Sequence, residues 1–270
     1  MTVSAGSQRP HPAFADERQA QIAELVSTRG RVHIAELTEK LGVTESTIRK
    51  DLTALHERGL LKRTHGGALA LPSTIERDFH QRETKDQPAK HAIARACLSL
   101  LNDGDSVFLD GGTTVDSIAR ALADPTSPAS PMRLSILTTA LGVATKIAKS
   151  PRIDSLLLGG EVRADEGTVV GALTLEILER FSFNLAFIGA SGFSESGVSV
   201  GSHAEAAVKA SVVERARRVV LPLVHTKVGS TDFAHVCDLD EVDTVVLDES
   251  TPALEELCAA HEIELVTARR

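Results

Sequence analysis

The segment from residue 32 to residue 52 constrains the fold of this chain most. It carries apolar residues at helical spacing in two stripes, formed by Ile34, Leu37 and Leu41 and then by Ile48, Leu52 and Leu55. Gly42 follows the first stripe directly, where a glycine lets a helix end in a left-handed residue. Two short amphipathic helices joined by such a turn form a helix-turn-helix, whose second helix enters a DNA major groove. The segment therefore predicts binding to duplex DNA.

Polar and basic residues open the second helix. Thr44 is a candidate N-cap, and Thr47, Arg49 and Lys50 lie on the turns that would face the groove. An alternative stays open, because short helices around a glycine also occur in helical bundles that bind no nucleic acid.

The stretch after the second helix is typical of the hairpin of a winged helix. Gly59 is expected to end the helix, and Gly66-Gly67 to form a tight turn between two short strands. Basic residues here would lie near the phosphates beside the groove, where they give position and affinity rather than sequence choice. The predicted DNA contacts are Thr44, Ser46, Thr47, Arg49, Lys50, Lys62, Arg63 and His65.

Two motifs in this region have the sequence of a known family. Residues 47–52 read Thr-Ile-Arg-Lys-Asp-Leu, and residues 65–68 read His-Gly-Gly-Ala. They resemble the DeoR-type bacterial transcriptional repressors. The commoner form has a second arginine at the position of Lys50; lysine keeps the charge but loses the planar fork that pairs with a guanine edge.

Length and charge are compatible with a regulator of two domains. The 270 residues, 42% of them hydrophobic, suffice for a small domain and one larger core. The net charge of −8 is unevenly divided, since residues 1–70 hold 10 Lys and Arg against 8 Asp and Glu, and residues 71–270 hold 19 against 29. The acidic bulk therefore lies outside the DNA-binding segment.

Composition also narrows the class of protein. Three cysteines without a Cys-x-x-Cys spacing argue against a disulfide framework and a zinc site, so we expect neither a metal nor another cofactor. No apolar run approaches the roughly 18 residues of a membrane span, and no signal-peptide core opens the chain. We expect a cytoplasmic protein with no membrane partner. Eight Phe without Tyr or Trp make stacking on single-stranded nucleic acid an unsuitable mode of binding.

The domain boundaries follow from these patterns. We expect a disordered tail over residues 1–13, a winged helix-turn-helix over 14–70, a linker over 71–89 and an effector-sensing α/β domain over 90–270. Pro72, Pro88 and many charges in the third range suit a connector.

From Ser106 onward, short apolar strands alternate with amphipathic helices, the pattern of a mostly parallel α/β sheet with helices on both faces. Four apolar segments end in loops rich in glycine or hydroxyl side chains: residues 107–109, 135–138, 155–158 and 185–188. Ligands of open α/β sheets bind beside the carboxyl ends of the strands. We therefore expect a small anionic metabolite at this edge.

The turn from Asp110 to Thr114, Asp-Gly-Gly-Thr-Thr, is the candidate anion seat. It puts free backbone N–H groups and two hydroxyls at a helix N-terminus, where phosphate binds readily. The alternative is a plain connection between strand and helix, in which Asp110 holds the turn instead of binding a ligand hydroxyl.

These loops resemble the sensor domain of DeoR-type repressors, which shares a fold with ribose-5-phosphate isomerase. The resemblance also includes residues 159–163, Glu205 with Lys209, and residues 226–229, and it covers nearly the whole chain. It implies that a phosphorylated sugar or similar metabolite binds here and changes the affinity for operator DNA. The implied effector-binding residues are Asp110, Gly111, Gly112, Thr113, Thr114, Thr138, Thr139, Gly159, Gly160, Gly189, Ser191, Glu205, Lys209 and Lys227.

Three positions depart from the family pattern. Asn184, Ser191 and Val224 stand where relatives usually carry an acidic residue. Because isomerase relatives need acids near the sugar for proton transfer, we expect no catalytic residues, and an effector other than the commonest hexose or pentose phosphates.

The expected function is repression of a carbohydrate catabolism operon by a homodimer or homotetramer. The alternatives are a sugar-phosphate isomerase or transferase whose helices only dimerise the chain, and an architectural DNA binder without a ligand. Single residues have alternatives too. Lys227 suits a solvated loop, Glu205 and Lys209 suit a surface ion pair worth at most about 0.5 kcal/mol, and His203 and His225 suit structural roles.

Overall fold

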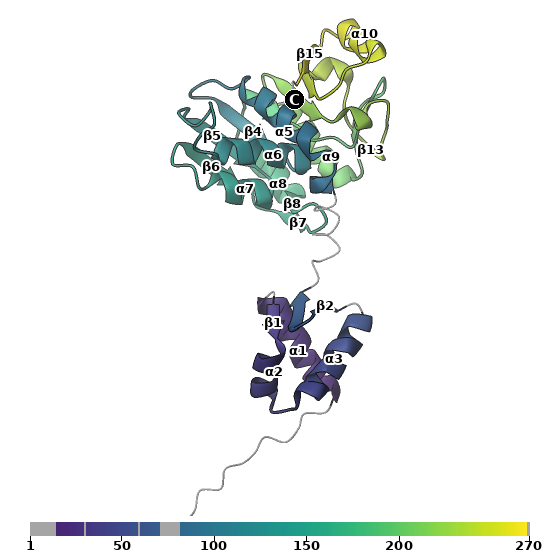
Figure 1. Ribbon diagram of the computed structural model, residues 1–270. Helices are drawn as coiled ribbons and strands as arrows, with labels where there is room; N and C mark the ends of the chain where they lie inside the picture. Colours follow the sequence, from purple (N-terminus) through teal and green to yellow (C-terminus); the bar gives the residue numbers. More distant parts are fainter. Residues whose placement is uncertain (1–14, 30, 59, 71–81, 269–270) are drawn as a thin grey trace, which may run out of the picture. The chain divides into compact units, whose positions relative to one another are not determined.

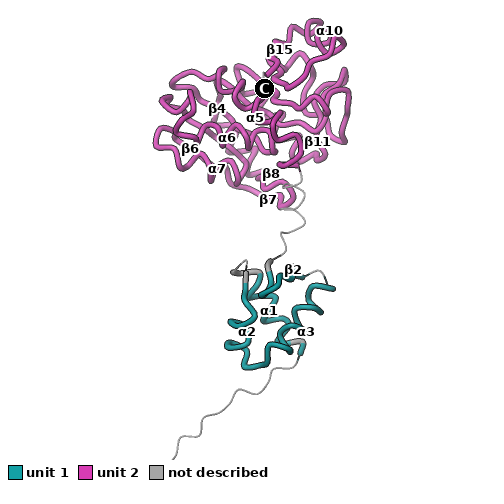
Figure 2. The backbone as a smooth tube through the Cα atoms, in the orientation of Figure 1, with its two compact units in different colours: residues 1–73 teal, residues 74–270 magenta. Residues whose placement is uncertain are grey.

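The computed structural model describes residues 15–29, 31–58, 60–70 and 82–268. The chain forms two compact units, residues 1–73 and 74–270 (Figures 1 and 2). The predicted tail, Gly59 and residues 71–81 of the predicted linker lie outside the described residues.

The N-terminal unit has the predicted helix-turn-helix. Its helices are α1 (Ala15–Arg29), α2 (Ile34–Leu41) and α3 (Glu45–Glu57). Gly42 ends α2 in the left-handed region at φ 64°, and the Thr44 side chain accepts a hydrogen bond from the Thr47 N–H at 3.4 Å. The apolar stripes face inward, and Leu37, Ile48 and Leu52 are buried in one core. The spacing that predicted these two helices is therefore confirmed.

The predicted wing is an antiparallel hairpin of β2 (Leu61–Thr64) and β3 (Gly67–Ala70), to which β1 (Arg31–His33) adds a third strand beside β3. The turn comprises His65 and Gly66, one residue before the predicted turn. Gly67 belongs to β3 instead, where it pairs with His33 and Thr64. A Cβ on this residue would lie 2.0 Å from the backbone oxygen of Val32. Glycine at this position lets β1 approach the hairpin.

The C-terminal unit is built on a seven-stranded sheet in the order β15-β14-β12-β9-β4-β5-β6, with every neighbouring pair parallel. Its strands are β4 (Ser106–Leu109), β5 (Leu134–Thr138), β6 (Ile153–Leu157), β9 (Leu185–Phe187), β12 (Val219–Leu223), β14 (Thr244–Leu247) and β15 (Glu264–Thr267). Smaller sheets pair β7 (Glu161–Arg163) with β8 (Thr168–Val170), and β11 (Gly197–Val200) with both β10 (Gly192–Ser194) and β13 (Ala234–Cys237).

Helices cover both faces of the large sheet, as predicted. Successive strand residues point to opposite faces, so Val107 and Leu109 pack in one core and Phe108 in the other. The first core includes residues of α5 (Gln87–Leu98), α6 (Thr113–Ala123) and α7 (Leu141–Ile147). The second includes residues of α8 (Ala172–Leu178), α9 (His203–Val213) and α10 (Pro252–Ala260).

The predicted linker is wrong at its end. Residues 82–84 are helical, and α5 begins at Gln87 with Pro88 in its first turn. Proline suits that place because the first N–H groups of a helix need no partner within it. Within the described residues, every helix is too short or too polar to cross a lipid bilayer.

Candidate functional sites

The side chains predicted to contact DNA are accessible in the N-terminal unit. All are exposed except Thr47, which is half-buried. Those on α3 or its N-cap are Thr44, Ser46, Thr47, Arg49 and Lys50, and those on the hairpin are Lys62, Arg63 and His65. A nucleic acid can therefore reach every one of them.

Hydrogen bonds fix α3 to its neighbours. Arg63 Nη1 donates to Thr53 Oγ1 at 2.7 Å, and Thr53 Oγ1 donates to the backbone oxygen of Arg49 at 2.7 Å, which links the hairpin to α3. The buried Asp51 accepts from Arg18 Nε of α1 at 2.6 Å, and this hydrogen bond raises the pKa of the guanidinium. These bonds hold α3, which carries the exposed side chains, in a fixed position relative to the hairpin and to α1.

A cavity of about 520 Å³ opens in the C-terminal unit at the carboxyl ends of β4, β9 and β12. The predicted effector-binding residues that line it are Gly111, Gly112, Thr113, Thr114, Gly189, Ser191, Glu205, Lys209 and Lys227. Its volume suits a small molecule, and its place is the edge at which such sheets bind ligands.

The amino terminus of α6 forms one wall of this cavity. Gly112 is its N-cap at φ 99°, a conformation that favours glycine. A Cβ on Gly111 would lie 2.4 Å from Thr168 Cγ2, so glycine also permits the close approach of β8. The first N–H groups of a helix have no partner within it and attract anions. The turn can therefore seat a phosphate beside Thr113 and Thr114.

Asp110 lies beneath this seat. It is buried, and its carboxylate accepts from the Gly189 N–H at 2.8 Å and pairs with Lys209 Nζ. These bonds tie the ends of β4 and β9 to α9. Of the two roles open to Asp110, the structure favours holding the turn.

The alternative of a surface ion pair between Glu205 and Lys209 is wrong. Lys209 is buried with a side chain 2% exposed, and its Nζ pairs with both Asp110 and, at 3.0 Å, Glu205. Burial by itself lowers the pKa of Lys209, but the two carboxylates outweigh it and raise that pKa above its usual value. The cause is topology, because the sheet places Asp110 next to a lysine 99 residues further along the chain.

Lys227 follows β12 in a short 3₁₀ turn, η1 (His225–Lys227). Its Nζ donates to the backbone oxygen of Ala190 at 2.5 Å. Burial, together with the nearby charges of Lys209 and Lys90, lowers the pKa of Lys227 to about 8. An anion in the cavity would relieve this unfavourable environment.

Besides Asp110, four predicted effector-binding residues lie outside the lining of the cavity: Thr138, Thr139, Gly159 and Gly160. The Thr138 side chain accepts from the Ala140 N–H at 3.0 Å, and the Thr139 backbone oxygen accepts from the Val169 N–H at 2.8 Å. A Cβ on Gly160 would lie 2.1 Å from Thr174 Oγ1. In the structure, these residues shape the turns that follow β5 and β6.

The cavity contains acidic residues, although the sequence predicted the loss of three acids at Asn184, Ser191 and Val224. Asn184 stands at the amino end of β9, where its Oδ1 accepts from the Ser106 N–H at 2.9 Å. Treating Asn184 as a lost ligand contact is therefore wrong, because the two ends of parallel strands lie at opposite edges of a sheet. Ser191 and Val224 do line the cavity, but carboxylates from other segments line it as well: Asp86, Asp165, Glu166 and Asp232. The cavity has thus kept acids that can bind ligand hydroxyls.

Two groups of cations in this lining were not predicted from the sequence. Arg82 and Lys85 come from the segment predicted as a linker, Lys90 is the first residue after it, and Arg163 comes from β7. Arg163 Nη1 pairs with Glu205 Oε2 at 3.0 Å. Pro88 in a charged stretch, interpreted as a helix start instead of a connector, is the signal that could have revealed the first group.

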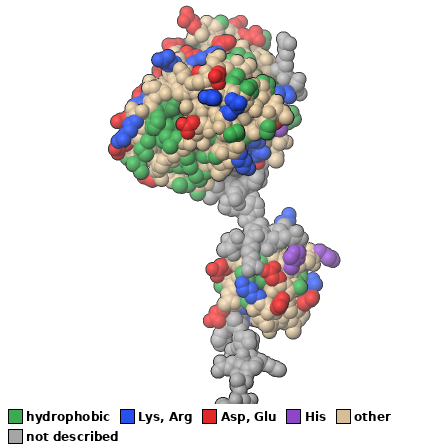
Figure 3. Space-filling view, turned by 90° about the vertical axis from the view of Figure 1, so that its left-hand side faces the viewer, with side chains coloured by type: hydrophobic (Ala, Val, Ile, Leu, Met, Phe, Trp, Pro, Cys, Tyr) green, Lys and Arg blue, Asp and Glu red, His purple; other side chains and the backbone are tan. Residues whose placement is uncertain are grey.

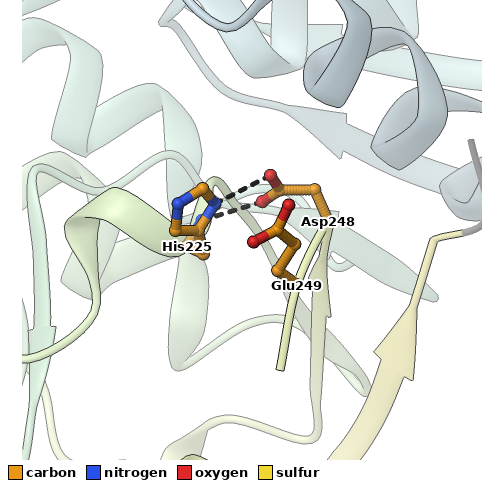
Figure 4. A group of neighbouring side chains, drawn as sticks. All are labelled: His225, Asp248 and Glu249. Atoms are coloured by element: carbon orange, nitrogen blue, oxygen red, sulfur yellow. Dashed lines mark hydrogen bonds and ion pairs between the residues drawn. The ribbon is translucent and has the colours of Figure 1, made fainter. Parts of the chain in front are cut away.

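A histidine beside the cavity anchors η1. Figure 4 shows His225 facing Asp248, with Glu249 next to them. The Asp248 carboxylate accepts from the backbone N–H of His225 and from its Nδ1, both at 2.8 Å, and the latter bond raises the pKa of His225. The three side chains lie close enough to share a metal ion, a grouping that the sequence did not suggest. Because both oxygens of Asp248 already bind His225, the arrangement serves to hold the turn that carries Lys227.

Comparison with known proteins gives matches over both units. Residues 18–74 match the DeoR-like helix-turn-helix domain, and residues 85–249 match the DeoR C-terminal sensor domain. Part of the fold also matches ribose 5-phosphate isomerase A from Methanocaldococcus jannaschii, with a TM-score of 0.40 at 17% identity over 53% of this chain and 55% of that one.

Curated relatives match over nearly their whole length. The glycerol-3-phosphate regulon repressor of Escherichia coli K12 is 31% identical over 92% of this chain and 97% of its own. The transcriptional regulator GlpR of Haloferax volcanii is 33% identical over 88% and 91%, and the lactose phosphotransferase system repressor of Staphylococcus aureus N315 is 31% identical over 86% and 91%. The chain therefore belongs to the DeoR family of DNA-binding transcriptional regulators.

Proposed function

We propose that this protein is a cytoplasmic repressor of a carbohydrate catabolism operon, and that a phosphorylated sugar or related anionic metabolite in the cavity controls its affinity for operator DNA. The observation that carries the proposal is that one cavity is lined by the amino terminus of α6, by the buried Lys209 and by the half-buried Lys227. Backbone N–H groups and lysines together favour a phosphate, and the carboxylates of the lining suit sugar hydroxyls.

The names of the relatives support the same function. Two of them are repressors of a glycerol-3-phosphate regulon and of a lactose phosphotransferase system. An isomerase is not favoured, because the family and its named members are regulators. The reason differs from the one drawn from the sequence, since acids are present in the cavity.

Electrophoretic mobility shift on the DNA upstream of this gene tests the proposal, with and without a panel of sugar phosphates. We expect one compact shift that at least one phosphorylated compound weakens or strengthens, while the same sugars without phosphate have no effect. A shift that responds to no metabolite would favour the architectural binder, and the absence of a specific shift would contradict the proposal.

We also propose that the protein acts as a homodimer or homotetramer, since two recognition helices are needed to read a two-fold operator. The outer edge of β6 supports this. The sheet order ends at β6, so among the described strands it pairs only with β5. Seven large hydrophobic side chains are exposed among the described residues, and five of them belong to β6 and to elements next to it in the chain or in contact with it: Leu141, Leu156, Leu157, Val162 and Leu173. Leu141 begins α7, which contacts β6, Val162 lies on β7, and Leu173 precedes Thr174, which donates to the backbone oxygen of Gly159 just after β6.

Figure 3 looks onto the side of the C-terminal unit on which β6 and α7 lie in Figure 1, and hydrophobic side chains gather there over a broad area. We call Leu141, Leu156, Leu157, Val162 and Leu173 the β6 patch. An open strand edge is self-complementary, since a second copy related by a two-fold axis can pair its own β6 antiparallel to the first. A second copy of this chain is therefore the occupant that we assign to the patch.

A further inference from the structure

The segment at the amino-terminal end of the described C-terminal unit is part of the cavity wall. Arg82, Lys85, Asp86 and Lys90 line the cavity together with the anion seat at Gly111–Thr114. This segment is also where the chain enters the unit, after residues 71–81 that connect it to the DNA-binding unit. One stretch of chain thus meets the ligand site and leads to the DNA-binding unit.

The side chain of Lys90 holds this segment through hydrogen bonds to its backbone. It is 5% exposed, and its Nζ donates to the backbone oxygens of Arg82 and, at 2.6 Å, of Lys85. A lysine ammonium has three N–H donors, so these two carbonyls leave one for another acceptor. Asp86, between the helical turn and α5, has a left-handed backbone at φ 55°, which costs energy for a residue other than glycine. The conformation of the segment therefore depends on the hydrogen bonds from Lys90, which offset this cost.

Ion pairs fasten the same segment to the cavity walls. The Arg82 guanidinium pairs with Glu166 at 2.9 Å, beside the β7–β8 hairpin. Glu83 pairs with Arg120 of α6, whose amino terminus is the anion seat. Lys90 and Arg82 line the same cavity as Lys227, and their positive charges contribute to the lowered pKa of that lysine. The ion pairs that hold the segment and the anion seat at Gly111–Thr114 are therefore close enough for their charges to interact.

We propose that Lys90 couples an anion in the cavity to the segment 82–86. The third N–H of Lys90 donates to the anion while the other two keep their hydrogen bonds to the carbonyls of Arg82 and Lys85, and the segment is thereby held more tightly. This inference rests on the proposed function, since it assumes that the cavity takes an anion. Both present hydrogen-bond acceptors of Lys90 are uncharged carbonyls, and burial outweighs the nearby carboxylates of Asp86 and Glu83 and lowers its pKa. An anion that accepts the third N–H adds a charged partner, so the clamped arrangement becomes more stable and opens less often. By linkage, a state of the DNA-binding unit that loosens the segment weakens anion binding by the same factor.

Hydrogen exchange followed by mass spectrometry on the full chain tests the coupling, with inorganic phosphate as the probe and chloride at equal ionic strength as the reference. We expect phosphate to slow exchange in the peptide over residues 82–92 and in the peptide over residues 110–118. In Lys90→Met, slowing should persist over residues 110–118 and be lost over residues 82–92. Lys149→Met removes an exposed lysine outside the cavity lining and should behave as the parent does.

The two peptides separate the possible failures. Slowing over residues 110–118 alone in the parent chain would overturn the coupling and leave the anion site standing. Equal slowing over residues 82–92 in the parent and in Lys90→Met would overturn the role of Lys90. Phosphate without effect on either peptide would contradict the anion site and the coupling together. The parent chain alone can overturn the coupling, so the test does not depend on whether Lys90→Met folds.

Discussion

At the scale of single residues, two lysines that line the cavity, Lys209 and Lys227, have neighbours of opposite charge. Lys209 is neutralised by Asp110 and Glu205, so its charge is part of the folded framework. Lys227 donates to a carbonyl oxygen and has other cations nearby. Of these two charges, that of Lys227 is the one that an anion in the cavity would compensate.

The pKa of Lys227, about 8, gives a signed pH dependence. Between this value and the usual lysine pKa of about 10.4, the unfolded chain binds a proton that the folded chain does not, so this lysine makes the fold more stable as pH rises. Anion binding has the opposite trend, because it needs the protonated form. With glycerol 3-phosphate as the probe, calorimetry from about pH 7 to about pH 9.5 should show affinity falling as pH rises through about 8.

Lys227→Met provides the control for this trend. The charges that face Lys227 are those of Lys209, Lys90, Arg82 and Glu166, and the variant leaves all four in place. We expect weaker binding of the probe and loss of most of the pH dependence. An equal fall of affinity with pH in the variant would assign the titration to another group.

Arg49 is the residue whose loss should separate DNA binding from folding. Its side chain is 50% exposed, and the ion pair with Glu45 at 3.5 Å is a surface i,i+4 pair that contributes little to stability. Arg49→Ala should lose roughly 1–3 kcal/mol of specific operator binding, measured by fluorescence anisotropy, while the melting temperature stays close to that of the parent. Operator binding equal to that of the parent would show that α3 is not the recognition helix.

At the scale of elements, the β6 patch and the open edge of β6 predict a self-association surface. Leu173 is 56% exposed and is the second residue of α8, so a carboxylate at this position also suits the amino terminus of the helix. Leu173→Glu should therefore keep the fold and weaken association, since it places a charge within the apolar patch. Light scattering after size-exclusion chromatography should show the parent as a dimer or tetramer and the variant at half that mass or less.

Phe233 offers the matched control for this experiment. It is 81% exposed and lies outside the β6 patch, so Phe233→Glu adds the same charge to another apolar position. Its mass should equal that of the parent. If Leu173→Glu also keeps the mass of the parent, the protein associates through a different surface, and a monomeric parent would contradict the oligomer itself.

At the scale of the whole molecule, the cavity is assembled from segments that are remote in sequence. Its walls come from residues 82–90, 111–115, 163–166, 189–191, 205–209 and 222–227, with Gly201 and Asp232 at single positions. Three of these segments, residues 111–115, 189–191 and 222–227, meet at one edge because they lie at the carboxyl ends of the parallel strands β4, β9 and β12. A ligand bound there would touch both the framework of the sheet and the segment that leads to the DNA-binding unit, as control of DNA binding by a metabolite requires.

The sequence by itself determined the elements whose signal is local. Apolar spacing and Gly42 predicted α2 and α3, alternation along the strands predicted a sheet covered on both faces, and the glycines and threonines of residues 111–114 predicted the turn into α6. Each of these depends on residues within a few positions of one another, because helix and strand periods repeat over short distances.

Only the tertiary structure decided which charges are buried together and which segments share the cavity. From the sequence, Lys209 suits a surface residue, but in the structure it is buried beside Asp110 at the end of β4. Asn184 likewise suits a ligand position, but β9 places it at the opposite edge of the sheet. Lys90 likewise reads as part of the sequence next to a linker. Burial and long-range pairing depend on how distant strands are ordered in the sheet, and that order leaves no trace in the spacing of neighbouring residues.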